Sequence, residues 1–343
     1  MILYRKGAPL RVRRYAAPEP PFWCAASVAT YGAKRATPIA IDYVSLRASA
    51  GERLEVAVCD HVRDELERMR PLGEPVFVDA AEAAEEVFRR GEEATAFCEE
   101  RDLGTLHLVS TRGTLPARAY AQSVVAIAAW PMELARLEAL FEEARTRSLR
   151  WGVAVPLVYP VTTDLAPLGE LANIARKFGA TFFASIPLDV EATARQAIAQ
   201  SMNLDGEDDR YAMLFHGDVI PIHLATERHI AALAAEQGMA DFLLPPRWDE
   251  RSNWNAAILL TLTASRMIAM DVDLNLAGLI ARSARVIADL DKPIARVAEA
   301  ASLSIIEALD AVSVEVLTEW IVGGTSSFVE SVNEDWRMKR GGI

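Results

Sequence analysis

A histidine and an acidic residue close together at the end of an expected strand are the first candidates for chemistry. The segment Tyr211–Asp218, YAMLFHGD, is predicted to be a strand that ends in His216 and Asp218. Such a pair can share a metal ion, or act as a general base with the acid that orients it. A metal would need a third ligand, which Asp60 or His61 could supply only from a neighbouring strand. We predict His216 and Asp218 as catalytic candidates and predict no resident metal.

Polar residues also follow two other expected strands. Asp79 follows the run EPVFV, and Ser110, Thr111 and Arg112 follow the run TLHLV. A guanidinium such as that of Arg112 can grip a carboxylate through two hydrogen bonds. Each position also has a structural interpretation, because Asp79 can cap a helix and Arg112 can form a salt bridge on a surface turn.

Short β-branched runs alternate with amphipathic segments through the first 245 residues. The runs LEVAVCD, EPVFVDA, TLHLVST, SVVAIAAW, WGVAVPLVYP, ATFFASIPLD, YAMLFHGD and ADFLLPP predict strands, and 132–147 and 165–178 predict helices. This alternation is typical of a complete or partial β/α barrel or of an open doubly wound sheet. We favour the barrel, because no Gly-rich phosphate-binding fingerprint follows the first strands.

The chain after the barrel is expected to be helical. Helices are predicted over 253–270, 274–289, 294–308 and 313–322. We therefore predict an N-terminal segment (1–20), an α/β barrel domain (21–247) and a helical C-terminal region (248–343). The stretch PPRWDERSNWN at 245–255 lies at the last boundary, where it could line a pocket, form a partner surface, or pack as a junction in which Asp or Ser caps the next helix.

Charge and composition limit the classes of partner that the protein is expected to bind. The formal net charge is −12 at pH 7, and this argues against duplex nucleic acid, whose binders concentrate Lys and Arg. The apolar segment 256–270 is interrupted by Arg266 and is too short to span a bilayer, so it predicts a buried helix. With no apolar segment following the basic N-terminus, we expect a cytoplasmic protein that has no membrane contact.

Several segments in their order between residues 21 and 188 resemble the spore photoproduct lyase-like branch of the radical S-adenosylmethionine enzymes. The segments are CAASVATYGA, LGEPVFVDAAEAAEE, FCEERD, LVSTRGTLPAR, RWGVAVPLVYPVTTD and KFGATFF. The resemblance covers about half of the chain and implies a partial (β/α)6 barrel with its site in the loops at the strand C-terminal ends. It implies S-adenosylmethionine as a possible ligand, with Asp79, Ser110, Thr111 and Arg112 at positions that would bind it.

The cysteine loop departs from that family's pattern. The family holds a 4Fe–4S cluster with three cysteines spaced C-x3-C-x2-C, and here those positions are Cys24, Val28 and Tyr31. Valine cannot bind iron, and a tyrosine oxygen is a poor substitute for a thiolate. Cys59 and Cys98 are more readily explained as small buried hydrophobic residues than as replacement ligands.

Two functions are favoured, and a third, repair-type nucleic-acid binding like that of the lyase-like branch, is opposed by the net charge. The first is a pseudoenzyme or accessory protein that lacks the iron–sulfur cluster and binds a small molecule or a protein partner. The second is an enzyme with metal-assisted or acid–base chemistry on the same barrel, which would use His216, Asp218 and Asp79. In either case His107, which alternates within an apolar strand, is expected to be a core residue.

Overall fold

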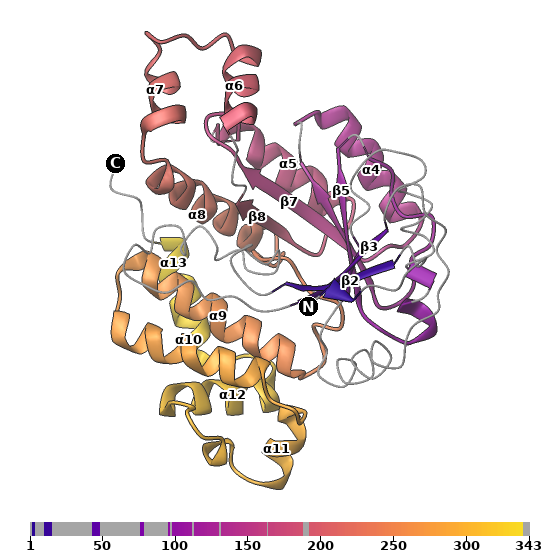
Figure 1. The fold of residues 1–343 in the computed structure, drawn as a ribbon, viewed down its shortest axis with the longest axis vertical. Coiled ribbons are helices and arrows are strands. Elements are labelled where there is room, and N and C mark those ends of the chain that lie inside the picture. Colours follow the sequence, from indigo (N-terminus) through magenta and orange to yellow (C-terminus); the bar gives the residue numbers. More distant parts are fainter. Residues whose placement is uncertain are drawn as a thin grey trace.

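The computed structural model describes residues 95–96, 98–111, 113–129, 132–162, 164–187 and 192–338, together with the backbone of four strands nearer the N-terminus. Eight strands form one sheet in which each strand lies beside its neighbours in the sequence (Figure 1). The strands are β1 (Ile2–Leu3), β2 (Leu10–Tyr15), β3 (Tyr43–Ala48), β4 (Val76–Val78), β5 (Thr105–Ser110), β6 (Ser123–Ala128), β7 (Trp151–Leu157) and β8 (Phe183–Pro187).

Of the described strands, β2 alone runs opposite to the others. β1, β2 and β3 pair antiparallel, whereas every pairing from β3 to β8 is parallel. Parallel neighbours require crossover connections, and α4 (Leu134–Thr146) and α5 (Ala166–Lys177) supply two of them. β6 and β7 are buried along their whole length, as expected for strands covered on both faces. The prediction of an α/β fold with parallel strands is confirmed.

One face of the sheet packs against α4, α5 and α8 (Ile220–Glu236). The strand residues Val153 and Phe183 share a hydrophobic core with Leu137 of α4 and Leu171 of α5. The Phe141 ring of α4 stacks on Trp151 with a centroid separation of 4.8 Å. The apolar stripes of α4 and α5 therefore cover the sheet in the way that their amphipathic sequences predicted.

The opposite face of the sheet packs against α9 (Asn253–Met270), which is buried along almost its whole length. The sheet presents small side chains here, including Ala126, Ala154 and Ala184, to a helix that is itself rich in alanine. Small residues on both sides let the helix backbone approach the strands closely. The predicted buried helix over 256–270 is confirmed, and its role is to cover this face.

The last part of the chain is helical, as predicted. It contains α9, α10 (Leu274–Ala288), α11 (Ile294–Ala300), a 3-10 turn η2 (Leu303–Ile305), α12 (Ala311–Gly323) and α13 (Ser327–Met338). α11 is shorter than expected because the chain leaves the helix at Ala301 and Ser302 caps the following turn. α13 lies within the region predicted to be helical, although no separate helix was predicted at its position.

The expected strand at 211–218 is wrong. Those residues lie largely in α7 (Asp209–His216), which pairs with α6 (Ala192–Ser201) in a helical hairpin that projects from one end of the molecule (Figure 1). The Asp208 side chain caps α7 by accepting from the Arg210 N–H at 2.8 Å. Tyr211, Leu214 and Phe215 have helical spacing and pack in one hydrophobic cluster.

The expected strand at 240–246 is reduced to one bridge. Ala240 pairs with Phe182 in parallel, beside the start of β8. Pro245 and Pro246, at the end of the expected strand, have no N–H group to donate to a ladder. Within the described residues, no helix is both long enough and apolar enough to cross a membrane.

Candidate functional site

The two predicted catalytic residues lie where α7 ends and α8 begins rather than at a strand end. His216 is in the last turn of α7, Asp218 follows it, and both are exposed. The Asp218 carboxylate accepts a hydrogen bond from the Ile220 N–H at 3.1 Å, at the start of α8. In the described part of the chain, no hydrogen bond or ion pair joins these two side chains. The prediction that this pair lies at the end of a strand is therefore wrong.

The structure describes part of the predicted cofactor-binding set. Asp79 and Arg112 lie outside the described residues, and for Ser110 the structure describes the backbone, which pairs with Ala128 of β6. Thr111 is completely buried, and its hydroxyl donates to the Ala128 carbonyl oxygen at 3.1 Å. This hydrogen bond links the carboxyl ends of β5 and β6, so the side chain of Thr111 has a structural role there.

Cys98 does not fit a cluster ligand. The side chain is completely buried, and burial raises the pKa of its thiol far above the usual range despite the nearby Arg101. An iron–sulfur cluster binds thiolates, and this cysteine stays protonated at neutral pH. Cys24, Val28, Tyr31 and Cys59 lie outside the described residues.

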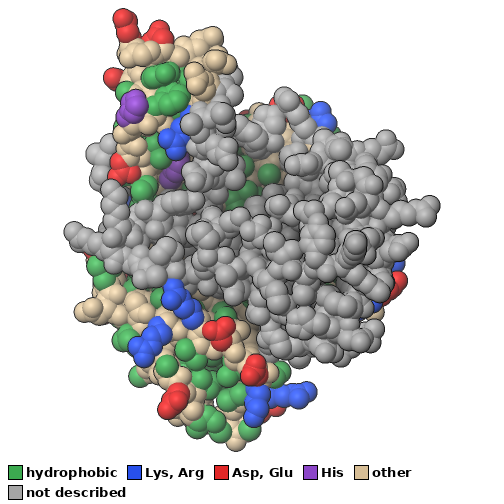
Figure 2. All heavy atoms as spheres, in the orientation of Figure 1, with side chains coloured by type: hydrophobic (Ala, Val, Ile, Leu, Met, Phe, Trp, Pro, Cys, Tyr) green, Lys and Arg blue, Asp and Glu red, His purple; other side chains and the backbone are tan. Residues whose placement is uncertain are grey.

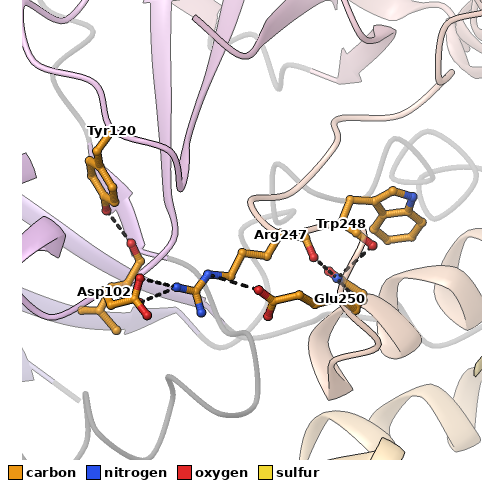
Figure 3. Close-up of polar contacts among 7 residues, drawn as sticks. Asp102, Tyr120, Arg247, Trp248 and Glu250 are labelled. Atoms are coloured by element: carbon orange, nitrogen blue, oxygen red, sulfur yellow. Dashed lines mark hydrogen bonds and ion pairs between the residues drawn. The ribbon is translucent and has the colours of Figure 1, made fainter.

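The segment 245–255 forms a clamp between the sheet and the helical region (Figure 3). The Arg247 guanidinium lies 2.5 Å from the Asp102 carboxylate and donates to the Asp102 carbonyl oxygen at 3.0 Å, just before β5. The Asn255 amide donates to the carbonyl oxygens of Arg247 and Glu250, each at 2.8 Å. The amide thus fixes the turn that carries Arg247.

Aromatic packing and a helix cap complete this clamp. Trp248 packs edge-on against Phe242 at 5.0 Å and lies 6.4 Å from Trp320 of α12. Ser252 caps α9 by accepting from the Asn255 N–H at 3.2 Å. These contacts match the junction interpretation of this aromatic and polar segment, in which serine caps the next helix.

A buried ionic cluster lies where α8, α9 and α13 meet. Asp241 accepts from Arg266 of α9 at 2.8 Å and from Arg337 of α13 at 3.3 Å. Arg266 also donates to the Asn333 amide oxygen of α13. Burial raises the pKa of Asp241, but the two guanidinium groups outweigh it and hold that pKa below 3.8. The carboxylate therefore remains ionised and links three segments of the chain.

Glu227 of α8 lies beside this cluster, close enough for Arg266 and Asp241 to act on its carboxyl group. The residue is 7% exposed, and its Oε2 atom is buried with no partner among the described residues. Burial raises the pKa of Glu227 to about 8, while Arg266 lowers it and Asp241 raises it. At neutral pH the Glu227 side chain is therefore mostly protonated.

Sequence reasoning missed this cluster, although one signal pointed to it. Arg266 interrupts an otherwise apolar helix, and a buried arginine needs a carboxylate or carbonyl partner. The identity of the partner could not be deduced, because Asp241 lies 25 positions away and the contact depends on how α9 packs. Glu227 gives a similar signal on the buried side of α8.

In the described part of the chain, no three side chains of His, Cys, Asp or Glu are grouped so that they could hold a metal ion.

Comparison with known proteins gives no match to a family model, to a curated protein or to a solved structure. The assignment of function therefore depends on the residues and geometry of this chain.

Proposed function

We propose that the chain is a radical S-adenosylmethionine-like barrel protein without an iron–sulfur cluster, which acts as a pseudoenzyme or accessory protein in the cytoplasm. Its role would be to bind a small molecule, with S-adenosylmethionine the first to test, or a protein partner. The observation that carries the proposal is the sequence of the cysteine loop, where Val28 and Tyr31 occupy two of three ligand positions.

The fold is compatible with this proposal. The strands β3–β8 are parallel and follow one another in chain order, as a partial β/α barrel would require. Cys98 offers no replacement thiolate, because it is buried and protonated. The α9 helix occupies one face of the sheet with apolar side chains, which supports a ligand site in loops at the strand ends rather than against that face.

The alternative is an acid–base or metal-assisted enzyme that uses His216, Asp218 and Asp79. It requires these groups to converge on one substrate. The described geometry does not favour it, because His216 and Asp218 are exposed and lie at the junction of two helices.

Iron reconstitution tests the proposal directly. The wild-type chain, purified without oxygen and treated with iron and sulfide, is expected to hold no cluster and to produce no 5′-deoxyadenosine from S-adenosylmethionine. The double variant Val28→Cys, Tyr31→Cys completes the three-cysteine spacing and is expected to bind about four iron atoms per chain. Adding Cys24→Ala to that variant is the matched control and should abolish the uptake.

Each result bears on a different part of the proposal. A cluster in the wild-type chain would refute the loss of the radical reaction. Failure of the double variant to bind iron, while it remains folded, would refute the relationship to the radical enzymes. Calorimetry with S-adenosylmethionine then tests the ligand, and the absence of heat would leave a protein partner as the proposed target.

A further inference from the structure

The connection between β8 and α8 is longer than a strand-to-helix connection usually is. β8 ends at Pro187 and α8 begins at Ile220, whereas such connections commonly span about two to six residues. The additional chain forms the helical hairpin of α6 and α7, which projects from the molecule (Figure 1). The hairpin follows the carboxyl end of β8, the edge at which β/α folds carry ligand sites in their loops. Its position therefore suits a role in controlling access to such a site.

The hairpin has a small hydrophobic core of its own. The buried residues of this core are Val158, Ile198, Ala199, Leu204 and Leu214. None of the hairpin residues that the structure describes belongs to either of the two cores on the faces of the sheet. Of the five, Val158 is the one that lies outside the hairpin, in the loop that follows β7. The described hairpin thus packs on that loop rather than on a face of the sheet.

The loop after β7 is an ordered support for the hairpin. The Thr162 hydroxyl accepts a hydrogen bond from the Val158 N–H at 2.7 Å, which closes the loop on itself. Val158 is 3% exposed, and Tyr159 and Val161 are partly buried against the hairpin core. Separation of the hairpin would therefore uncover this loop, which lies at the carboxyl end of β7. A region held by few buried apolar contacts opens at a lower free energy than the core of a domain.

The junction with α8 lets the hairpin move without breaking α8. α7 ends at His216, and the Gly217 N–H donates to the Met213 carbonyl oxygen at 3.0 Å. A Cβ added at Gly217 would lie 2.8 Å from that oxygen, so the chain leaves α7 at a position that requires glycine. The Asp218 carboxylate accepts from the Ile220 N–H at 3.1 Å at the start of α8. Each helix therefore has its own end, and movement at this junction costs α8 no backbone hydrogen bond.

We propose that the α6–α7 hairpin is a lid over the carboxyl end of β7. It separates from the loop at 158–162 to admit a ligand and packs on that loop again to cover the bound molecule. The ligand rests on the proposed function, whereas the opening rests on the packing of the hairpin alone. The opening breaks the contacts with one loop and leaves both cores of the sheet intact.

Cysteine labelling of the full chain tests the opening. Val158→Cys places a thiol beneath the hairpin, and Val155→Cys is the matched control in the core of the sheet, where Val155 is completely buried. Each chain is treated with an alkylating reagent without denaturant, and peptide mass spectrometry separates the new site from the native cysteines. Position 158 is expected to react while position 155 stays protected.

A second pair of substitutions shows whether the hairpin core governs that reaction. Leu214→Ala truncates the hairpin core and should speed labelling at position 158 by about thirtyfold or more, with no effect at position 155. Leu140→Ala in α4 is the matched control, because Leu140 and Leu214 are both 7% exposed and Leu140 belongs to the core of the sheet. It should leave labelling at position 158 unchanged.

S-adenosylmethionine tests whether the opening serves a ligand. At a concentration about 100 times the Kd found by calorimetry, it should slow labelling at position 158 by about a hundredfold, because a ligand held only by the closed form opposes opening. Unchanged labelling with the ligand bound would overturn the lid and leave the proposed ligand standing. Absence of heat would overturn the ligand, and the labelling rates of the free chain would still decide whether the hairpin opens.

Three results in the free chain would overturn the proposal. The first is equal labelling at positions 158 and 155, because the loop would then be exposed only when the sheet unfolds. The second is a Leu214→Ala chain that labels at position 158 no faster than its parent. The third is failure of Leu214→Ala to fold, which would make the hairpin an integral part of the main structure.

Discussion

Asp241 shows how one carboxylate can hold together parts of the chain that are distant in sequence. It follows α8 and binds guanidinium groups from α9 and α13, and its own side chain is 4% exposed. A buried carboxylate that is fully paired adds little net stability over an apolar residue, but removal of one partner leaves charges buried without compensation. Neutralising Asp241 should therefore lower the stability of the folded chain.

Asp241→Asn is expected to lower the free energy of unfolding by about 3–5 kcal/mol at pH 7, because Arg266 and Arg337 lose their counter-charge. The ionised Asp241 exerts its effect above its unfolded pKa of 3.8, and the effect is lost as pH falls through the lower folded value. Urea unfolding measures the change. Asp208→Asn, which removes the exposed pair with Arg210, is the control and should leave the midpoint unchanged.

Individual residues were predictable where burial alone decides their role. His107 was expected in the core, and it is 4% exposed with a pKa that burial lowers to about 4. The strand predicted at 211–218 is a helix, so the strand-end argument for His216 no longer applies, and its catalytic role stays a prediction. Partners such as Arg266 and Asp241 could not be deduced, because the packing of α8 and α9 brings them together and no local pattern encodes it.

At the scale of elements, the sequence predicted the strands and helices that have strong periodicity. β6, β7 and α9 agree with the hydrophobic pattern because each is buried over most of its length. α7 was misassigned because its apolar run YAMLF fits a short strand as well as a helix. The cap at Asp208 and the hydrophobic cluster with α6 decide in favour of the helix.

Gly152 in β7 is the glycine at which a side chain would do most damage. A Cβ added there would lie 2.5 Å from the Phe182 carbonyl oxygen, and it would also collide with the Phe182 ring. Gly152→Ala is therefore expected to force β7 and β8 apart and to cost about 1–3 kcal/mol. Thermal unfolding measures the loss.

Gly169→Ala in α5 is the matched control for that substitution. An added Cβ at Gly169 meets no atom within 4 Å, and alanine is favoured over glycine in helices by up to about 1 kcal/mol. The control should raise the melting temperature slightly. Equal melting temperatures for the two variants would contradict the close approach of Phe182 to β7.

At the scale of the whole molecule, the described part of the sheet and the helical region share one hydrophobic core. That core contains strand residues such as Ala154 and Ile186 together with Leu260 of α9 and Trp320 of α12. The clamp of Arg247 and Asn255 adds polar contacts at the same boundary (Figure 3). On the face drawn in Figure 2, the described side chains of the helical region include hydrophobic, basic and acidic groups side by side.

The shared core predicts one cooperative unfolding transition. Far-ultraviolet circular dichroism and tryptophan fluorescence should give the same midpoint in urea. Leu260→Ala, at a completely buried position of α9, should lower both midpoints together by an equivalent of about 2–5 kcal/mol. Two separate transitions, or a change in one signal alone, would show that the sheet and the helices unfold as independent units.

The position of α9 has a consequence for how the chain is made. A ribosome releases β5 to β8 before residues 253–270, so the strand face that α9 covers has no partner when it first emerges. Nascent chains that end before that helix should bind holdase chaperones and should lose this affinity once it has left the exit tunnel. A stop codon before α9 would therefore leave an aggregation-prone fragment rather than a smaller functional protein.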